Sequence, residues 1–528
     1  MSIVVRRLTY NHVDKETLFQ ALSFSVKRGQ KVALIGNNGT GKSTLMRIIS
    51  GELIASSGEI ICEETPYYVP QHFGQYDHLT VAEALRIDKK LTALQAITEG
   101  NVSEENFTEL GEDWDIEERA LTALADWGLS GISLFRPLAS LSGGEKTRVL
   151  LAGIHLHLPE IILLDEPTNH LDCECRERLY EFIRNSKATI VVISHDRVLL
   201  NLLSSIYELD KKGVTFYNGN YDIYKAQKDV RVHALYSQLD EKEKELRQAH
   251  KVAQETAERK QKLDARGERR SAKKRVSRMA MNTLRDRAEK STSAMKGVHE
   301  EKQRNIAEKL TDIRADLPDI KSMKVDFNNS SLHAGKTLIT ARQINFSYSS
   351  SPLWKRNLDF LIKSGDRVLI RGRNGSGKTT LLRLMTGEIP PSEGVLTIAD
   401  FQYVYLDQEY SIIRDDLSVF EQVRQFTAVR QEHEIKMILN RFLFPLSTWD
   451  KSCTKLSGGE KMKLALCCLM VRADTPDIFM LDEPTNNIDI QNVEILTATV
   501  KDFRGTVLLI SHDTSFIEEI GIDYTIEL

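Results

Sequence analysis

Residues 31–43, KVALIGNNGTGKS, decide the fold of this chain. KVALI is a short apolar run with β-branched residues, which is typical of a buried parallel strand. The octet GNNGTGKS, residues 36–43, satisfies the pattern GxxxxGK[ST] in full, and the helix-forming segment STLMRIIS begins at its last residue. A strand, a glycine loop and a helix in this order predict a phosphate-binding loop, because backbone N–H groups and the helix N-terminus then face the phosphates.

The chain contains this pattern twice. DRVLI precedes a second octet, GRNGSGKT at residues 372–379, which lies 336 positions after the first. Four further motifs recur in the same order, at offsets of 337, 315, 317 and 317. They are Gln71 and Gln408, LSGGEK at Leu141 and Leu456, DEPTN with Glu166 and Glu483, and ISHD with His195 and His512. The ordered matches indicate an internal duplication. The drop from 337 to 315 places 22 extra residues in the first copy, between Gln71 and Leu141.

Each copy is predicted to be an α/β domain. Besides the strand before each octet, IILL precedes Asp165 and IFML precedes Asp482, and ATIVVIS and GTVLLIS supply a further apolar run in each copy. Short buried strands separated by helical segments predict a largely parallel sheet with helices on its faces. The predicted architecture is therefore two P-loop domains, residues 1–225 and 336–528, joined by residues 226–335.

The two octets are predicted to hold the phosphates of a nucleotide. Lys42 and Lys378 are expected to reach the β- and γ-phosphates. The hydroxyls of Ser43 and Thr379 are expected to bind Mg²⁺. The alternative is a purely structural turn, but two such octets, each between a strand and a helix, favour the binding interpretation. The predicted phosphate-binding residues are Gly36, Asn37, Asn38, Gly39, Thr40, Gly41, Lys42 and Ser43, and Gly372, Arg373, Asn374, Gly375, Ser376, Gly377, Lys378 and Thr379.

Two pairs of acids follow buried strands. Asp165 and Asp482 end apolar runs, as a carboxylate that orients Mg²⁺ in a P-loop nucleotidase does. Glu166 and Glu483 come next, where a carboxylate can polarise the attacking water. A DE pair alone is usually two surface acids. Its position after a strand, in a copy that also carries a glycine loop, favours a catalytic role.

The motifs LSGGE and LLDEP with a downstream histidine resemble those of the nucleotide-binding domains of ABC ATPases. The resemblance covers residues 1–225 and 336–528. It implies that the two domains pair head to tail and enclose two ATP molecules, each between one glycine loop and the other copy's LSGGE. Ser142, Gly143 and Gly144 would complete the site of Lys378, and Ser457, Gly458 and Gly459 that of Lys42. It also implies that Gln71 and Gln408 sense Mg²⁺ and water, and that His195 and His512 contact the γ-phosphate.

An aromatic residue is expected to stack on each adenine. Tyr348 lies 30 residues before Lys378, which suits this role, although a core or loop role is the alternative. The same distance before Lys42 gives His12, with Tyr10 two residues earlier. The first site therefore departs from the aromatic pattern, and its stacking residue stays open.

The segment between the copies differs from both. Residues 231–330 hold 25 Lys+Arg and 17 Asp+Glu, although the whole chain has a net charge of −4. Apolar residues at helical spacing, including Ile306 and Leu310, predict two long helices joined near residues 264–278. A basic cluster near this joint, Arg269, Arg270, Lys273, Lys274 and Arg275, is predicted to bind RNA, because phosphate backbones attract such clusters regardless of base sequence. A solvated charged linker is the alternative.

PTNHLD at residues 167–172 and NGNYDIYKAQKD at residues 218–229 resemble motifs of the ABC-F branch. This resemblance implies a translation factor or ribosome-protection factor that binds the ribosome when ATP is bound, near rRNA and tRNA at the tRNA exit site. Its linker would reach toward tRNA and the peptidyl-transferase region, and its role would be housekeeping or protection from antibiotics. The extra residues of the first copy, within residues 86–115, lie where that branch carries a ribosome-contacting arm, although here they are acidic. The alternative is the ATPase subunit of a transporter that recruits separate membrane proteins.

The composition of the chain excludes further classes of protein. Hydrophobic residues make up 41% of 528, too many for a wholly disordered chain. We find no apolar run of 18 residues and no signal-peptide core at the N-terminus, and the six cysteines form no CxxC pair. A cytoplasmic protein that works as a monomer through its two internal ATPase domains is the expectation.

Overall fold

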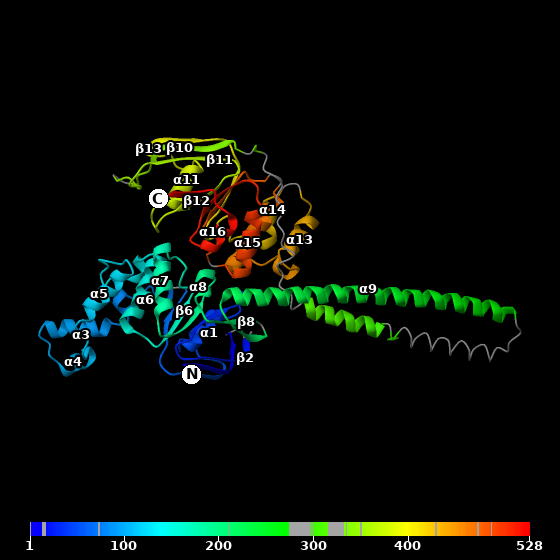
Figure 1. Ribbon diagram of the computed structural model, residues 1–528, viewed down its shortest axis with the longest axis horizontal. Helices are drawn as coiled ribbons and strands as arrows, with labels where there is room; N and C mark the ends of the chain where they lie inside the picture. Colours follow the sequence, from blue (N-terminus) through cyan, green and yellow to red (C-terminus); the bar gives the residue numbers. More distant parts are fainter. Residues whose placement is uncertain are drawn as a thin grey trace. The chain divides into compact units, whose positions relative to one another are not determined.

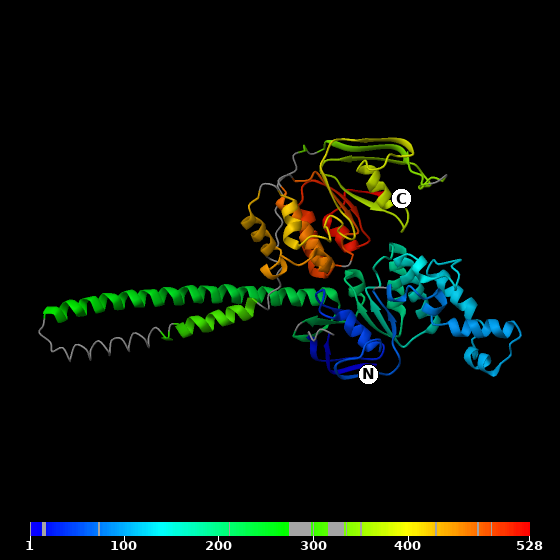
Figure 2. The same cartoon turned by 180° about the vertical axis from the view of Figure 1, so that it is seen from behind.

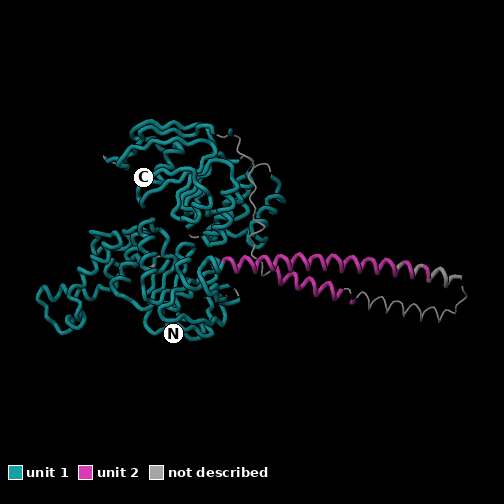
Figure 3. The backbone as a smooth tube through the Cα atoms, in the orientation of Figure 1, with its two compact units in different colours: residues 1–224, 322–528 teal, residues 225–321 magenta. Residues whose placement is uncertain are grey.

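The computed structural model describes residues 2–12, 17–71, 74–210, 212–273, 297–298, 300–314, 332–333, 335–348, 351–427, 430–472, 475–486 and 488–528. The chain divides into two compact units (Figure 3). Unit 1 comprises residues 1–224 and 322–528, and unit 2 comprises residues 225–321. Both copies of the repeat belong to unit 1, so the contacts between the copies are contacts within one unit.

The first copy is built on a six-stranded sheet with the order β5-β6-β7-β3-β8-β9. The strands from β5 to β8 pair in parallel, and β9 closes the edge as an antiparallel partner of β8. Their bounds are β3 Lys31–Ile35, β5 Tyr67–Val69, β6 Ile161–Asp165, β7 Thr189–Ile193, β8 Ser205–Asp210 and β9 Gly213–Asn218. The predicted parallel α/β sheet is confirmed.

The second copy repeats this topology in a five-stranded parallel sheet, β14-β15-β16-β12-β17. The bounds are β12 Arg367–Arg371, β14 Tyr403–Leu406, β15 Ile478–Asp482, β16 Thr506–Ile510 and β17 Tyr524–Glu527. Position by position, this order matches that of the first five strands of the first copy. The duplication that the motif offsets indicate therefore extends to the fold.

Each copy also has a three-stranded antiparallel sheet, which the sequence motifs do not predict. The orders are β2-β1-β4 and β11-β10-β13. Their bounds are β1 Ile3–Asn11, β2 Thr17–Val26 and β4 Ser57–Cys62, and β10 Thr337–Asn345, β11 Leu358–Lys363 and β13 Glu393–Ile398. These strands have exposed residues along their length, and β4 and β13 are mostly exposed, so they lack the continuous apolar runs that mark the parallel strands.

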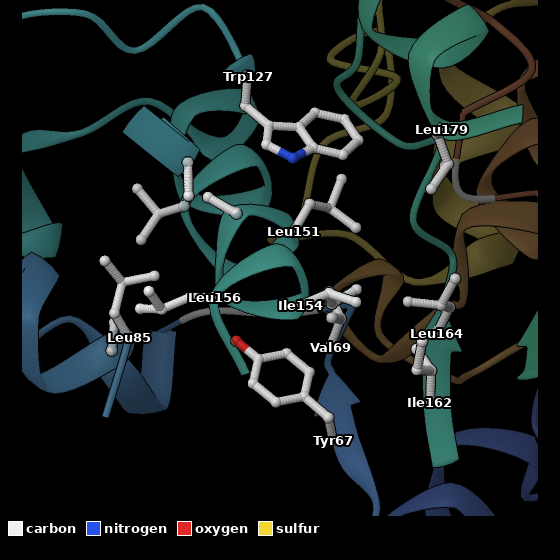
Figure 4. Close-up of a cluster of buried hydrophobic side chains, with 14 of the residues drawn as sticks. Tyr67, Val69, Leu85, Trp127, Leu151, Ile154, Leu156, Ile162, Leu164 and Leu179 are labelled. Carbon is white, nitrogen blue, oxygen red and sulfur yellow. The ribbon is translucent and has the colours of Figure 1, made fainter. Parts of the chain in front are cut away.

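The buried strands separate two cores. Alternate side chains of β6 point to opposite faces: Ile161 and Leu163 join a core with the antiparallel sheet, whereas Ile162 and Leu164 join a core with the helices. Figure 4 shows part of the second core, where Ile162 and Leu164 lie near side chains such as Leu151 and Ile154. Because both faces of β6 are buried, Asp165 at its end is held by a rigid element.

The helices of the first copy are α1 Lys42–Ile49, α2 Val81–Ala84, α3 Asp88–Thr98, α4 Glu104–Leu110, α5 Ile116–Asp126, α6 Gly143–His157, α7 Cys173–Asn185 and α8 Arg197–Asn201. Those of the second copy are α11 Lys378–Met385, α12 Val419–Gln425, α13 Glu432–Arg441, α14 Gly458–Val471, α15 Ile490–Asp502 and α16 Thr514–Ile520. By their order, α12 and α13 correspond to α2 and α5. The helices α3 and α4 are therefore the extra segment of the first copy, within the predicted residues 86–115.

The inserted helices are part of the first copy's core rather than a detached loop. Leu91 and Ala93 of α3 and Leu110 of α4 belong to the same buried cluster as α5 and α6. Figure 1 and Figure 2 both show α3 and α4 at the end of the first copy far from β2. Residues 86–115 carry three basic and eight acidic side chains.

Unit 2 contains most of the long helix α9, Tyr221–Lys273, and the helical residues 300–314. The second helix packs on α9, since Arg314 Nη2 donates to Glu243 Oε1 over 2.8 Å and Ile306 and Leu310 are buried. The expected joint near residues 264–278 is wrong for residues 264–273, which belong to α9, and residues 274–278 lie outside the described residues. The helix α9 continues through Gly267, since one glycine costs a helix only about 1 kcal/mol.

Part of the predicted RNA-binding cluster lies outside the residues that the structure describes. Arg269, Arg270 and Lys273 are on the last turns of α9, whose side chains are not described there, and Lys274 and Arg275 lie outside the described residues.

Among the helices in the described ranges, none combines the length and the apolarity that crossing a membrane requires.

Candidate functional site

Each glycine loop curls around its own lysine. Lys42 Nζ donates to the carbonyls of Gly36 and Asn37 over 2.7 and 3.1 Å. Lys378 Nζ makes the matching bonds to Gly372 and Arg373 over 2.9 and 3.3 Å. The strand before each loop and the helix that begins at each lysine hold this geometry.

The residue before each lysine has to be glycine. Gly41 and Gly377 have φ of 94° and 90°, and a Cβ on either would lie within 2.6 Å of a leucine side chain, that of Leu18 or Leu353. The loops thus place backbone N–H groups and an ammonium at a helix N-terminus, a donor set that fits the phosphates of a nucleotide.

The two strand-end aspartates are held by tyrosines. Tyr405 OH donates to Asp482 Oδ2 over 3.0 Å, and Thr379 Oγ1 donates to the same oxygen over 2.9 Å. In the first copy Tyr68 OH donates to Asp165 Oδ2 over 3.3 Å. A hydroxyl beside a carboxylate at the octet fits a magnesium ion. The sequence motifs do not single out these tyrosines, although they recur at offset 337, as Gln71 and Gln408 do.

Glu166 and Glu483 share an uncommon backbone conformation. Their φ values are 50° and 49°, in the left-handed region that residues other than glycine seldom adopt. In each copy the N–H of the glutamate donates to the strand before the histidine, to Ile193 O over 2.8 Å and to Ile510 O over 2.9 Å. The strain is held by buried structure, which is typical of functional positions.

Burial sets the proton affinity of both glutamates. It raises the pKa of Glu166 to about 8, with the charge of Asp165 adding to the rise. It raises the pKa of Glu483 to about 7, against the lowering effect of the Arg176 and Lys378 charges. A carboxylate whose pKa is near neutral is a better proton acceptor than an ordinary one. Both glutamates therefore suit the role of general base.

A histidine lies beside each glutamate. His195 Nε2 is 3.1 Å from Glu166 Oε1, and His512 Nε2 is 3.3 Å from Glu483 Oε1. Burial, with the charge of Lys42 adding to it, holds the pKa of His195 well below its usual value. Burial also lowers the pKa of His512 to about 3, with Lys378 and Arg176 adding to it. Both imidazoles are neutral near pH 7, so each can donate one N–H without carrying charge into the site.

The first glycine loop and the second copy's LSGGE line one cavity of about 610 Å³. Lys42, Ser43 and Glu166 line it from the first copy, and Ser457 and Gly458 line it from the second. Gln71, Asp165 and His195 also line it. The cavity therefore brings together the residues that the sequence predicts for the first composite site.

The second glycine loop meets the first copy in the same way. Asn374 Nδ2 donates to His170 O over 2.8 Å, and a Cβ on Gly144 would lie 3.6 Å from the same Nδ2. Conversely, a Cβ on Gly459 would lie 3.9 Å from Asn38 Nδ2. Each loop thus faces the LSGGE of the opposite copy, which is the reciprocal pairing that the ABC resemblance implies.

The LSGGE serines begin helices. Ser142 and Ser457 are the N-caps of α6 and α14, and each forms a reciprocal capping pair with the glutamate three residues on. The glycine N–H groups of the first turn therefore point away from the helix toward the facing loop. Helix N-termini of this kind favour an anion such as a γ-phosphate.

Two predicted residues have neighbours that the motifs did not indicate. Gln408 lines the cavity of the first site, and its Nε2 lies 3.3 Å from His170 Nδ1. His512 Nδ1 lies 3.2 Å from the Sγ of Cys173 in the other copy. Both contacts join residues more than 230 positions apart, so no local pattern could reveal them.

The adenine positions differ between the sites. Tyr348 is 67% exposed, with its ring edge-on to Phe346 and its hydroxyl 2.9 Å from Thr380 Oγ1, so one ring face is open for stacking. In the first copy His12 lines the cavity and Tyr10 packs edge-on against it. Of these two residues, His12 is the one that lines the cavity of the first site.

Comparison with known proteins agrees with this geometry. The family model described as ABC transporter matches residues 19–169 and 355–486, one match in each copy. The chain is 30% identical to ABC transporter F family member 2 of Arabidopsis thaliana, over 96% of this chain and 73% of that protein. It is 29% identical to the uncharacterized ABC transporter ATP-binding protein YfmR of Bacillus subtilis, over 98% of this chain and 80% of that protein.

A solved structure shares the tandem fold. It is an archaeal ribosome recycling factor in complex with an archaeal ribosomal stalk protein, with a TM-score of 0.58, 19% identity, and coverage of 99% of this chain and 87% of that one. At this identity the likeness shows the fold alone. The two family matches together span more than half of the chain, and the F family relative aligns along nearly all of it. The chain therefore belongs to the ABC transporter family, as a tandem ATPase of its F branch.

Proposed function

We propose that this ATPase binds the ribosome in its ATP-bound state and regulates or protects translation. Its partners would be rRNA and tRNA near the tRNA exit site, with the tip of unit 2 directed toward tRNA and the peptidyl-transferase region. Its place of action would be the cytoplasm. It would work as a monomer, because one chain supplies both halves of each ATP site. The proposal includes Mg²⁺, whose bound charge would neutralise the phosphates and orient the attacking water.

The residues that would hold the metal ion come from three motifs in each copy. They are Ser43, Gln71 and Asp165 in the first copy and Thr379, Gln408 and Asp482 in the second. The hydrogen bond between Thr379 and Asp482 supports this assignment, because it brings a hydroxyl and a carboxylate oxygen within 2.9 Å of each other. Glu166 and Glu483 would then accept the proton of the attacking water.

The observation that carries the proposal is the pairing of each glycine loop with the opposite LSGGE. A triphosphate bound at Lys42 would also touch the N-terminus of α14, and one bound at Lys378 would touch that of α6. ATP would therefore hold the copies together, and loss of the γ-phosphate would release them, as in other nucleotide switches. The bound nucleotide would thus decide whether a large partner binds the closed or the open arrangement of the two copies.

Unit 2 supports a ribosomal partner. At 1.5 Å per residue, the 53 residues of α9 form a helix about 80 Å long. Its distal part belongs to residues 262–290, which hold 11 Lys+Arg and four Asp+Glu. A long helix that ends in a basic stretch can deliver positive charge to RNA at a distance from the ATP sites. A transporter subunit would have no use for such an element.

Sedimentation of a hydrolysis-deficient variant tests the proposal. The variant Glu166→Gln with Glu483→Gln should bind ATP, remain closed and pellet with ribosomes in ATP but not in ADP. A second variant, Lys42→Ala with Lys378→Ala, serves as the control that cannot hold the phosphates and should stay in the supernatant. Equal pelleting in ATP and ADP would contradict the switch. Pelleting with membranes instead of ribosomes would favour the transporter alternative.

A further inference from the structure

A buried arginine joins the two copies at the second ATP site. Arg176 lies on α7 of the first copy and is 8% exposed. A buried guanidinium is costly unless its N–H groups find partners. Its partners therefore indicate what it does.

The guanidinium of Arg176 contacts three loops of the site. Its Nε donates to Leu171 O over 3.1 Å, and its Nη1 donates across the copies to His512 O over 3.1 Å. The same Nη1 lies 3.9 Å from Asp196 Oδ2, next to His195 of the first site. One side chain thus touches the loop after the first copy's DEPTN and both histidine loops.

These contacts bear on the chemistry of the second site. The carbonyl of His512 is held by Arg176, while its ring lies against the carboxylate of Glu483 and 3.4 Å from Lys378 Nζ. Fixing the backbone limits the directions in which the imidazole can point. Arg176 itself does not lie at the reacting atoms.

The first site has no counterpart of this arginine. At offset 317, the position of Arg176 is occupied by Val493 on α15, which is buried at 4% exposure. Valine has no N–H group in its side chain that could donate to the carbonyl of His195. The two sites therefore differ in a residue that each receives from the opposite copy.

We propose that Arg176 is a positioning residue of the second ATP site, acting from the first copy to hold His512 against Glu483. Hydrolysis at the second site, at Lys378 and Glu483, then requires an arginine that the first copy supplies when the copies are closed. Hydrolysis at the first site, at Lys42 and Glu166, requires no such arginine from the second copy. The chain is in this sense asymmetric, although each copy carries a glycine loop, an LSGGE segment, a DE pair and a downstream histidine.

Steady-state rates of ATP hydrolysis in two backgrounds test this role. Glu166→Gln leaves hydrolysis to the second site, and Glu483→Gln leaves it to the first. In the first background, Arg176→Met should lower kcat about 10- to 100-fold with a less than twofold change in KM for ATP, because misplacement of a reacting group lowers the chemical rate more than binding. In the second background the loss should be several-fold smaller. Arg176→Lys, which keeps the charge, should restore part of the rate at the second site.

Arg178→Met is the matched control, because Arg178 lies on the same helix and pairs with Glu174 and the Asp126 carbonyl instead of His512. It should leave both rates unchanged. If neither single-glutamine variant hydrolyses ATP, the ADP formed in the first turnover is counted instead. This count uses chains that keep both Glu166 and Glu483. Two ADP per chain are then expected without the change and one with Arg176→Met. Equal slowing of both sites, a rate matching that of Arg178→Met, or a higher KM at constant kcat would overturn the proposal.

Discussion

The backbone N–H of Asn38, in the first glycine loop, donates a hydrogen bond over 3.3 Å to Oδ2 of Asp489 in the second copy. The other oxygen of Asp489 caps α15 by accepting from Asn492 N over 2.9 Å. One carboxylate thus starts a helix and contacts the phosphate loop of the opposite copy.

Asp489→Ser should separate these two functions. Serine is a good N-cap, so α15 should keep its start, but its shorter side chain cannot reach Asn38. We expect a thermal unfolding midpoint within about 2 °C of the unchanged chain, since 1 kcal/mol shifts a large domain by about 2–4 °C. We also expect ATP turnover to fall severalfold. Asp489→Ala, which loses the cap as well, should lower both, and unchanged turnover in both variants would rule out the contact as a functional link.

Removing both proposed general bases should stop hydrolysis without preventing nucleotide binding. Glu166→Gln with Glu483→Gln keeps the size and the hydrogen bonds of each side chain but cannot accept a proton. Loss of a positioned base lowers a rate by roughly 10²- to 10⁴-fold, which phosphate release would measure. Equilibrium binding of ATP should persist. The matched control changes two exposed glutamates, Glu117 and Glu518, to glutamine and should hydrolyse at the normal rate.

Tyr405→Phe should weaken the metal site of the second copy. The substitution removes the hydroxyl that donates to Asp482, and loss of such a supporting bond commonly costs about 10- to 100-fold in metal affinity or activity. We expect the Mg²⁺ concentration for half-maximal turnover to rise by about 10-fold, the lower end of that range. Tyr403→Phe, on the same strand, is the control, and an equal effect of both changes would show that the hydroxyl of Tyr405 has no special role.

The basic stretch of unit 2 should set the salt dependence of ribosome binding. Changing Arg269, Arg270, Lys273, Lys274 and Arg275 to Gln should weaken binding and flatten its dependence on salt, because each lost phosphate contact reduces the number of counterions released. Ribosome-free ATP hydrolysis should stay nearly intact. Sedimentation at several salt concentrations measures both the affinity and the slope.

A control for that experiment removes the same charge elsewhere. Five exposed basic residues of the second copy serve this purpose: Lys336, Arg342, Lys355, Arg356 and Lys363. Their replacement by Gln should change the slope much less. If the two five-residue variants behave alike, net charge rather than the tip of unit 2 governs binding.

Leu110→Ala should destabilise the first copy. Leu110, at the end of the inserted helix α4, is fully buried in the core that α5 and α6 share. Emptying such a position costs about 2–5 kcal/mol, so the thermal transition of the first copy should move to lower temperature. Phe107→Ala, at a position 41% exposed on the same helix, should move it far less. Equal small shifts would mean that the insertion is a detachable appendage.

Local patterns in the sequence predict the strand, loop and helix at the centre of each copy. The strand, loop and helix around Lys42 follow from adjacent residues, and the second copy around Lys378 follows from the constant offset. The expected joint begins at residue 264, close to Gly267, whereas α9 continues as a helix through residue 273. The antiparallel sheets were missed, since mostly exposed strands such as β4 and β13 have no continuous apolar run.

The sequence by itself determined the duplication, the parallel α/β sheets, the two phosphate loops and the acids beside them, because each depends on residues within one or two adjacent elements. Only the tertiary structure decided that Tyr405 supports Asp482, that Asn38 meets Asp489 and that Arg176 holds His512. These pairs lie 77, 451 and 336 positions apart. No periodicity connects such residues, since their proximity results from how strands pair within a copy and how the two copies pack.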